Sequence, residues 1–245
     1  MKTDFFEIYK AIAAGVKSDD CITCTAAGEV WSLVESANHS GIAMSTPGDS
    51  IAPMFPNGMV GISLSEAAKA VGSWNLSEAS LALAAANAYY NSPQRLEALG
   101  CYEPFENYCT AGLDITGKTI GLVGHLRGPE ELHQKAKQVY IIERSPLPGD
   151  YPDAACDFIL PRCDIVLITG SSIINKTLPH LLQLCKDAYT ILTGPSVPMC
   201  PELLDFGIDR LAGMAISDRP GMRRHTLENS MNNPYSYGTS FLIKK

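Results

Sequence analysis

The sequence predicts an α/β protein in two parts, a small α+β domain over residues 1–105 followed by a parallel α/β domain over residues 106–245. Two observations support this prediction. In the first part, short strand-like runs are followed by helices, whereas from residue 119 onward short apolar strands alternate regularly with helices. Such alternation is typical of a parallel sheet covered by helices on both faces.

The first part is expected to open with an amphipathic helix, because apolar residues recur at helical spacing over residues 4–16. An Ala-Gly turn between the first two strand-like runs favours an antiparallel hairpin or meander. These runs lie at residues 21–26, 29–34 and 41–45. Helices are then expected at residues 64–71 and 76–90. Asn75 and Glu78 are placed like a capping box for the second helix, whose many Ala and Leu residues indicate burial.

The second part follows a long connector over residues 100–117 that shows little periodicity. Its candidate strands lie at residues 119–123, 138–142, 165–169, 190–193 and 211–215. The segments between them read as helices at residues 130–136, 152–160, 178–185 and 201–206. No internal repeat or low-complexity segment is evident.

Charge and hydropathy exclude several kinds of partner. The formal net charge of −7 argues against nucleic-acid binding, which needs clustered Lys and Arg. One dense basic cluster, residues 219–225, is expected to be a helix end in solvent. The charged first ten residues do not form a secretory signal, and no stretch approaches the roughly 20 apolar residues of a membrane span. We therefore expect a cytoplasmic protein that binds neither nucleic acid nor membranes.

The eight cysteines are expected to be reduced, and mostly small buried side chains, since a chain of this size does not need disulfides for stability. Cys21 and Cys24 form the one close pair. In a strand, residues three apart point to opposite faces, so a zinc knuckle is not favoured there.

Functional side chains are expected beyond the carboxyl ends of the parallel strands, where the loops of such sheets converge on ligands. Four successive strand ends carry Gly, Ser, Thr, His or acidic residues in place of ordinary turn residues. They supply Gly124 and His125, then Glu143, then Thr169, Gly170, Ser171 and Asn175, and finally Gly194, Pro195 and Ser196.

Glu143 and His125 are the most informative of these residues. Glu143 ends its strand 19 residues after Gly124, where dinucleotide-binding and many methyltransferase domains place an acid on ribose hydroxyls. This favours a nucleoside-like ligand, and the alternative is an ion pair with Arg144 or Arg127 in solvent. His125 suits a general base, a metal ligand, a hydrogen-bond donor to a ligand, or a structural role.

The Thr-Gly-Ser and Thr-Gly-Pro-Ser turns at residues 169–171 and 193–196 offer backbone N–H groups and hydroxyls for anionic or carbonyl oxygens. The alternative is that they only cap helices and form tight turns. We favour a site, because the two turns resemble each other on strands that should lie close together.

Sequence motifs narrow the chemistry. The glycines at 121, 124 and 128 follow G-x-x-G-x-x-x-G, which is neither the dinucleotide fingerprint nor a P-loop. No nucleophile elbow or zinc-hydrolase pair of histidines occurs. A metal site would require the fold to bring His125, Glu143 and Asp150 together.

Several blocks of the sequence resemble one family across nearly the whole chain. They are GIAMSTPGD and GISLSEAAKAVGSWNLSEASLALAAANAYYN in the first part, and GLVGHLRG, YIIERSPLPGDYPD, DIVLITGSSIINKTLPHLL and TILTGPSVPMCPELLDFGIDRLAG in the second. Together they resemble the uncharacterised family described as putative heavy-metal chelation proteins. The resemblance implies an enolase N-terminal-like domain followed by a Rossmann-like domain, with a site between them.

That interdomain site would bring Thr46 and Pro47 of the STPGD block, and Asn87 of AAANAYY, toward the strand ends. Asn87 is also notable by itself, since a carboxamide in a buried, Ala-rich helix must find hydrogen-bond partners. The alternative for Asn87 is to cap the end of its own helix.

Three functions are compatible with these patterns. The first is a protein, or an enzyme, that handles a transition metal, a metal chelate or a pterin-, flavin- or siderophore-like small molecule in the interdomain cleft. The second is an enzyme that uses S-adenosylmethionine or a nicotinamide, and the glycine spacing counts more against nicotinamide. The third is a non-catalytic binding or scaffold protein. The expected partner is a small molecule or metal chelate, and a homo-oligomer is compatible with the sequence.

Overall fold

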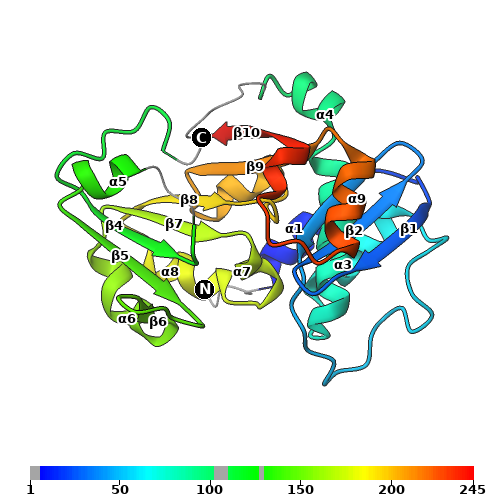
Figure 1. Cartoon of the computed structure of the whole chain (residues 1–245), viewed down its shortest axis with the longest axis horizontal. Coiled ribbons are helices and arrows are strands. Elements are labelled where there is room, and N and C mark those ends of the chain that lie inside the picture. The colour runs from blue at the N-terminus through cyan, green and yellow to red at the C-terminus, as the bar shows by residue number, and fades with distance from the viewer. Residues whose placement is uncertain (1–5, 102–109, 127–129) are drawn as a thin grey trace.

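Two β-sheets of different kinds organise this protein, as seen in a computed structural model that describes residues 6–101, 110–126 and 130–245. One sheet has three antiparallel strands and the other has seven strands that are mostly parallel. Figure 1 shows the two sheets on opposite sides of the molecule, with helices packed against both. The prediction of an α/β protein with a small antiparallel unit ahead of a larger parallel one is confirmed. The expected boundary at residues 105 and 106 lies outside the described residues.

The small sheet comes first in the chain. Its strands are β1 (Ile22–Ala27), β2 (Trp31–Ser36) and β3 (Ser40–Met44), paired in that order. The accompanying helices are α1 (Glu7–Gly15), α2 (Leu64–Ala68) with a 3₁₀ turn at Lys69–Gly72, α3 (Leu76–Tyr90) and α4 (Pro93–Ala98). The predicted elements are all present, and α4, which falls just before the expected connector, was not predicted.

Helix α3 begins where its cap predicts. The Asn75 side chain accepts a hydrogen bond from the Glu78 backbone N–H at 2.9 Å. Only half of the predicted capping box forms, because the Glu78 carboxylate accepts from the Phe55 backbone N–H at 2.8 Å instead. The helix lies very close to β3, since a β carbon at Gly41 would be 2.2 Å from the backbone nitrogen of Ala88. Glycine at this position therefore allows the helix and sheet to touch.

The large sheet contains β4 (Thr119–Val123), β5 (Gln138–Glu143), β6 (Tyr151–Pro152), β7 (Ile165–Thr169), β8 (Tyr189–Thr193), β9 (Arg210–Ile216) and β10 (Gly238–Lys244). The strand order is β10-β9-β8-β7-β4-β5-β6, and only β10 runs antiparallel to its neighbour. Read from the β6 edge of the sheet, the six parallel strands are the third, second, first, fourth, fifth and sixth along the chain. The order therefore reverses between β4 and β7, and this is the place where open α/β sheets bind ligands.

The helices of this part are α5 (Glu130–Lys135), α6 (Cys156–Ile159), α7 (Ser171–Ile174), α8 (Leu178–Leu184) and α9 (Arg219–Leu227). The segment expected to be a helix at residues 201–206 is a 3₁₀ helix, Pro201–Phe206. Within the described ranges, no helix is both long enough and apolar enough to cross a membrane.

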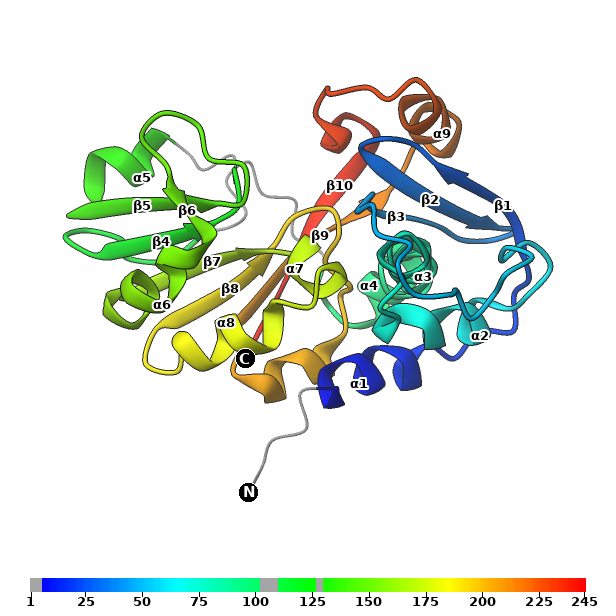
Figure 2. The same ribbon diagram turned by 90° about the horizontal axis from the view of Figure 1, so that it is seen from below.

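The end of the chain returns to the small sheet. Helix α9 packs against β1 and β2, which Figure 2 also shows. Arg223 Nε donates to Glu35 Oε2 at 2.6 Å, and Arg219 Nη2 donates to the Ser36 carbonyl at 2.6 Å. The expectation that the basic cluster is a helix end in solvent is therefore wrong for these two arginines, because a fully buried carboxylate on β2 attracts them.

Candidate functional site

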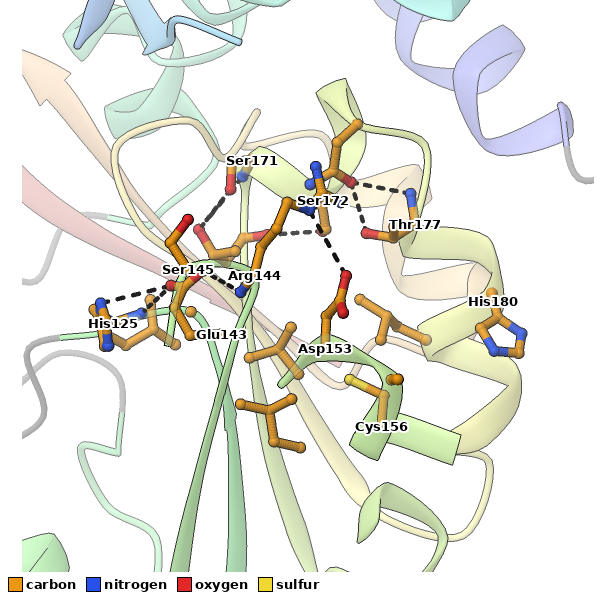
Figure 3. A pocket seen from close by; sticks show the side chains of 18 of the residues that line it. His125, Glu143, Arg144, Ser145, Asp153, Cys156, Ser171, Ser172, Thr177 and His180 are labelled. Atoms are coloured by element: carbon orange, nitrogen blue, oxygen red, sulfur yellow. Dashed lines mark hydrogen bonds and ion pairs between the residues drawn. The ribbon is translucent and has the colours of Figure 1, made fainter. Parts of the chain in front are cut away.

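A cavity of about 720 Å³ opens at the carboxyl ends of β4, β5 and β7, beside the point where the strand order reverses. Residues from both sheets line it, since Met44 of β3 joins residues of the large sheet, and Figure 3 shows the lining from the large-sheet part. The expected site residues that line it are Thr46, Gly124, His125, Glu143, Thr169, Ser171 and Asn175. Its other polar or charged lining residues are Arg144, Ser145, Asp153, Asp157, Ser172, Thr177 and His180.

The loop after β4 turns into the cavity at Gly124. This residue has φ of +105°, a conformation that favours glycine. A β carbon here would lie 3.1 Å from both Cβ and Cγ2 of Thr169 on the neighbouring strand β7. The Gly124 N–H donates to the Ile142 carbonyl on β5 at 2.9 Å. Glycine thus allows β4, β5 and β7 to converge, and it places the next residue, His125, at the cavity.

His125 lies between two carboxylates. Its Nε2 is 2.5 Å from Asp150 Oδ2, and its Nδ1 is 3.7 Å from Glu143 Oε2. The backbone N–H of His125 donates to that same Glu143 oxygen at 3.0 Å. Asp150 Oδ2 also accepts from the Leu147 backbone N–H at 2.8 Å. The fold therefore brings together the three residues expected to meet for metal binding, in the order Glu143, His125, Asp150.

The two carboxylates differ in their surroundings. The Asp150 side chain is 7% exposed and does not line the cavity, whereas Glu143 does. The hydrogen bonds from His125 and from the Leu147 N–H lower the pKa of Asp150 below its usual range. Within the part of the chain that the structure describes, no three His, Cys, Asp or Glu side chains are grouped closely enough to hold a metal ion.

The opposite wall comes from the segment after β7. Thr169 Oγ1 and Ser171 Oγ are 3.1 Å apart, and Ser172 Oγ donates to the Thr169 carbonyl at 2.7 Å. Asn175 Oδ1 accepts from both the N–H and the hydroxyl of Thr177, at 3.1 and 2.6 Å. These contacts fix the carboxamide of Asn175, whose nitrogen has no hydrogen-bond partner among the described residues.

The backbone of this wall is held by Lys176, which has φ of +66° although it is not glycine. Its ammonium donates to the Val71 carbonyl at 2.8 Å and lies 5.1 Å from the ring centre of Tyr9. Burial lowers the pKa of Lys176 to about 8. A lysine from the cavity wall thus reaches the helices of the small unit.

Three carboxylates, one guanidinium and two imidazoles line the cavity. Arg144 Nε is 3.8 Å from Asp153 Oδ2, and His180 Nε2 is 3.1 Å from Asp157 Oδ1. Figure 3 shows His125 and Glu143 at one end of the cavity and His180 at the other, with Arg144 and Asp153 between them. Aliphatic side chains complete the lining, namely Met44, Val123, Leu126, Ile142 and Leu181.

Cys156 also lines the cavity, as a protonated thiol. Burial, together with the negative charges of Asp153 and Asp157, raises the pKa of Cys156 to about 11. The thiol is therefore not a ready nucleophile at neutral pH.

Besides Asp150 and Asn87, five of the expected site residues do not line the cavity, and one of these, Ser196, contacts the small unit. Ser196 Oγ accepts from the Met44 N–H at 2.9 Å, and a β carbon at Gly170 would be 2.8 Å from the Ser196 carbonyl carbon. Gly194 has φ of +114° and its N–H donates to the Ala212 carbonyl at 3.0 Å, which shapes the turn that includes Pro195. The exposed Pro47, the fifth, follows Thr46 but lies outside the cavity.

Asn87, a further expected site residue, also lies outside the cavity. It neither faces the strand ends nor caps its own helix with its side chain. Its Nδ2 donates to the Ile42 carbonyl on β3 at 2.7 Å, and its Oδ1 has no partner. The close approach of α3 to β3 explains this placement, because it brings the carboxamide within reach of the strand.

The sequence reasoning missed Asn91, one turn after Asn87. Its buried carboxamide donates to the Val197 and Met214 carbonyls at 2.9 and 3.0 Å and accepts from the Met199 N–H at 2.9 Å. Asn91 thus ties the end of α3 to the loop after β8 and to β9. A second carboxamide one helical turn after Asn87 was the available signal.

Comparison with known proteins identifies the class. Residues 111–243 match the DUF364 family and residues 9–90 match the DUF4213 family, both of which are described as putative heavy-metal chelation. The chain belongs to the DUF364 family, which confirms the resemblance seen in the sequence.

Two crystal structures of DUF364 proteins with unknown function resemble the structure of this chain. The protein from Desulfitobacterium hafniense is 36% identical, with a TM-score of 0.88 over 100% of this chain and 99% of that chain. The protein from Pyrococcus horikoshii is 23% identical, with a TM-score of 0.77 over 98% of this chain and 99% of that chain, and it shows the fold alone.

A curated relative matches part of this chain. It is an uncharacterised protein of Methanocaldococcus jannaschii, 35% identical over 108 residues, which are 41% of this chain. The match spans 42% of that protein, which is less than half of its length.

Proposed function

We propose that the cavity between the two sheets binds a small organic molecule that presents hydrogen-bond donors or carries a metal ion. The observation that supports this is the character of the lining at the strand ends. Three carboxylates, those of Glu143, Asp153 and Asp157, face one guanidinium, that of Arg144, beside aliphatic side chains. Acceptors and negative charge favour donor-rich or cationic groups, and aliphatic walls favour a flat ring.

Pterin- and flavin-like compounds fit this description because they are planar and carry ring N–H groups. Siderophore-like compounds fit it through the metal ion that they hold. The Rossmann-like strand order supports the choice of this cavity, since ligands bind such sheets where the order reverses.

The family description implies a metal ion, but the described residues do not form a site for one by themselves. No three of their His, Cys, Asp or Glu side chains are grouped closely enough to hold an ion. His125 Nδ1 and Glu143 Oε2 are 3.7 Å apart, and His125 Nε2 is engaged by Asp150. The metal-bearing form of the proposal therefore concerns an ion that its own organic ligand holds.

The test is a thermal-shift screen of the intact chain with a pterin, riboflavin and nickel chelates, followed by calorimetry. A ligand at about a hundred times its Kd should raise Tm by about 5 to 10 °C. Glu143→Gln should remove this shift, and the matched change Glu97→Gln on the exposed face of α4 should leave it intact. The proposal fails if no compound stabilises the protein, or if Glu143→Gln responds as the unmodified chain does.

One observation favours a second function, an enzyme that uses S-adenosylmethionine or a nicotinamide. Glu143 ends the second parallel strand beside the glycine turn at Gly124, as the ribose-binding acid does in such enzymes. S-adenosylmethionine or NADH at millimolar concentration should then raise Tm in the same assay. If neither cofactor nor any compound of the first set stabilises the protein, a non-catalytic scaffold becomes the better description.

A further inference from the structure

Resting on the proposed function, we infer that this cavity selects planar heterocycles that present an amino group and a ring N–H side by side on one edge. A 2-amino-4-oxopyrimidine ring has such an edge. The carboxylate of Glu143 recognises it, with one carboxylate oxygen for each N–H. Pterins and guanine are two sources of this edge.

The acceptor positions of Glu143 are the first step. Its Oε2 accepts from the His125 backbone N–H at 3.0 Å, and its Oε1 accepts from the Arg144 backbone N–H at 2.6 Å. An ionised carboxylate offers about four lone-pair positions, two on each oxygen. Each oxygen of Glu143 therefore keeps one position for a ligand, and the two backbone hydrogen bonds hold both oxygens in place before a ligand arrives.

The side chains around this carboxylate are the second step. The Arg144 side chain does not pair with Glu143, because its Nε lies 3.8 Å from Asp153 Oδ2 instead, as Figure 3 shows. Among the residues that the structure describes, the one basic side chain beside Glu143 is His125. Its Nδ1 is 3.7 Å from Oε2, beyond hydrogen-bond length, and its Nε2 is engaged by Asp150. Hydrogen-bond donors on a ligand would therefore complete the coordination of this carboxylate.

The walls beside the carboxylate are the third step. Val123 and Ile142 are register partners on β4 and β5, and Ile142 directly precedes Glu143. Together with Leu126 they present aliphatic side chains to the cavity. Aliphatic walls favour the faces of a flat ring, whose edge is then free to meet a polar group. The cavity volume of about 720 Å³ leaves room for a ring that carries a substituent.

The edges that such a carboxylate rejects are the fourth step. Two parallel N–H groups match two carboxylate oxygens, as they do in bidentate pairs of arginine with a carboxylate. Flavins and lumazine carry a carbonyl where pterin carries its amino group. An oxygen of the ligand would then face an oxygen of Glu143, and neither can donate. Losing a hydrogen bond to a charged group lowers affinity by about 10- to 150-fold, so the amino group decides which ring is bound.

The experiment is calorimetry of the intact chain with two matched pairs of probes, pterin with lumazine and guanosine with inosine. Lumazine has a carbonyl in place of the amino group, and inosine has a hydrogen. In the pair that binds more tightly, which identifies the source of the ring, the amino compound should bind at least about 30-fold better than its partner. Glu143→Gln presents one donor and one acceptor, so it should bind lumazine at least as tightly as pterin. The matched change Glu97→Gln should preserve the preference of the unmodified chain.

The outcomes separate this inference from the proposed function. If pterin and lumazine bind equally well, Glu143 does not recognise the amino group and the inference is wrong, although the cavity still binds a flat ring. If guanosine and inosine bind equally well and more tightly than pterin, the ribose is recognised, which overturns the inference and supports the second function. If riboflavin or a nickel chelate stabilises the protein but no amino compound binds, the inference fails and the proposed function stands. Both fail if nothing binds. The probe pairs test the unmodified chain, so the result does not depend on the folding of Glu143→Gln.

Discussion

Replacing Arg223 with methionine removes the strongest contact of a buried carboxylate. Glu35 on β2 has an exposed fraction of 0% and accepts from Arg223 Nε at 2.6 Å. Arg219 Nε is farther away, at 3.5 Å from Glu35 Oε1. Breaking a buried ion pair by removing one partner costs about 3 to 5 kcal/mol, because a buried charge loses its compensation. Since Arg219 remains, we expect the lower end, a loss of about 3 kcal/mol in the free energy of unfolding.

Urea unfolding at neutral pH measures this loss, and calorimetry should show Tm falling by about 6 to 12 °C. Glu35→Gln should cost less, because the arginine side chains are 35% and 49% exposed and can turn to water. The double variant with Arg223→Met and Glu35→Gln should be more stable than Arg223→Met alone. Arg224→Met on the exposed side of the same helix is the matched control, within about 0.5 kcal/mol of the unmodified chain. Equal stability of the two arginine variants would refute the reasoning.

Two further changes test contacts between the parts of the molecule. Asn91→Ala removes three buried hydrogen bonds, those to the Val197 and Met214 carbonyls and from the Met199 N–H, so urea unfolding should show a loss of about 3 kcal/mol. A loss below about 1 kcal/mol would contradict the assignment. Lys176 has a pKa of about 8 in the folded protein and its ordinary value of 10.5 in the unfolded chain. Between these two pH values the unfolded chain binds more protons than the folded protein. The contribution of Lys176 therefore makes the free energy of unfolding rise with pH in this range. Lys176→Met lacks this rise. The free energy of unfolding of the variant minus that of the unmodified chain should therefore be larger at pH 7 than at pH 10, by up to about 3 kcal/mol. If this difference does not change with pH, Lys176 is not desolvated.

Local patterns predicted the elements whose boundaries depend on nearby residues. Helix α3 begins at its asparagine cap, and β4 and β7 end at the residues where their apolar runs stop. Strand β6 has only two residues, too few to show any periodicity, and β10 is an edge strand whose pairing with β9 is not visible in its own sequence. The basic cluster on α9 was misread for the same reason, since its carboxylate partner is 188 residues away along the chain.

The same distinction applies to the site. Gly124, Glu143 and Thr169 end neighbouring parallel strands, so their convergence follows from the alternation of strands and helices. The turn at residues 194–196 also follows a strand. The hydroxyl of Ser196 in this turn, however, accepts a hydrogen bond from the Met44 backbone N–H of the small unit. Such use depends on how the two units pack, which no local pattern records.

The return of the chain to the small sheet has a consequence for the order of events during synthesis. Trp31, Leu33 and Ile42 share one apolar cluster with Met214, Ile216 and Met222. At about 5 to 20 residues per second, the ribosome needs roughly 10 to 35 s to make the chain between these two sets. Throughout that interval the outer face of the first sheet has no cover of its own. Folding of this protein in the cell therefore begins with an open apolar surface, which chaperones can bind and which only the last part of the chain can close.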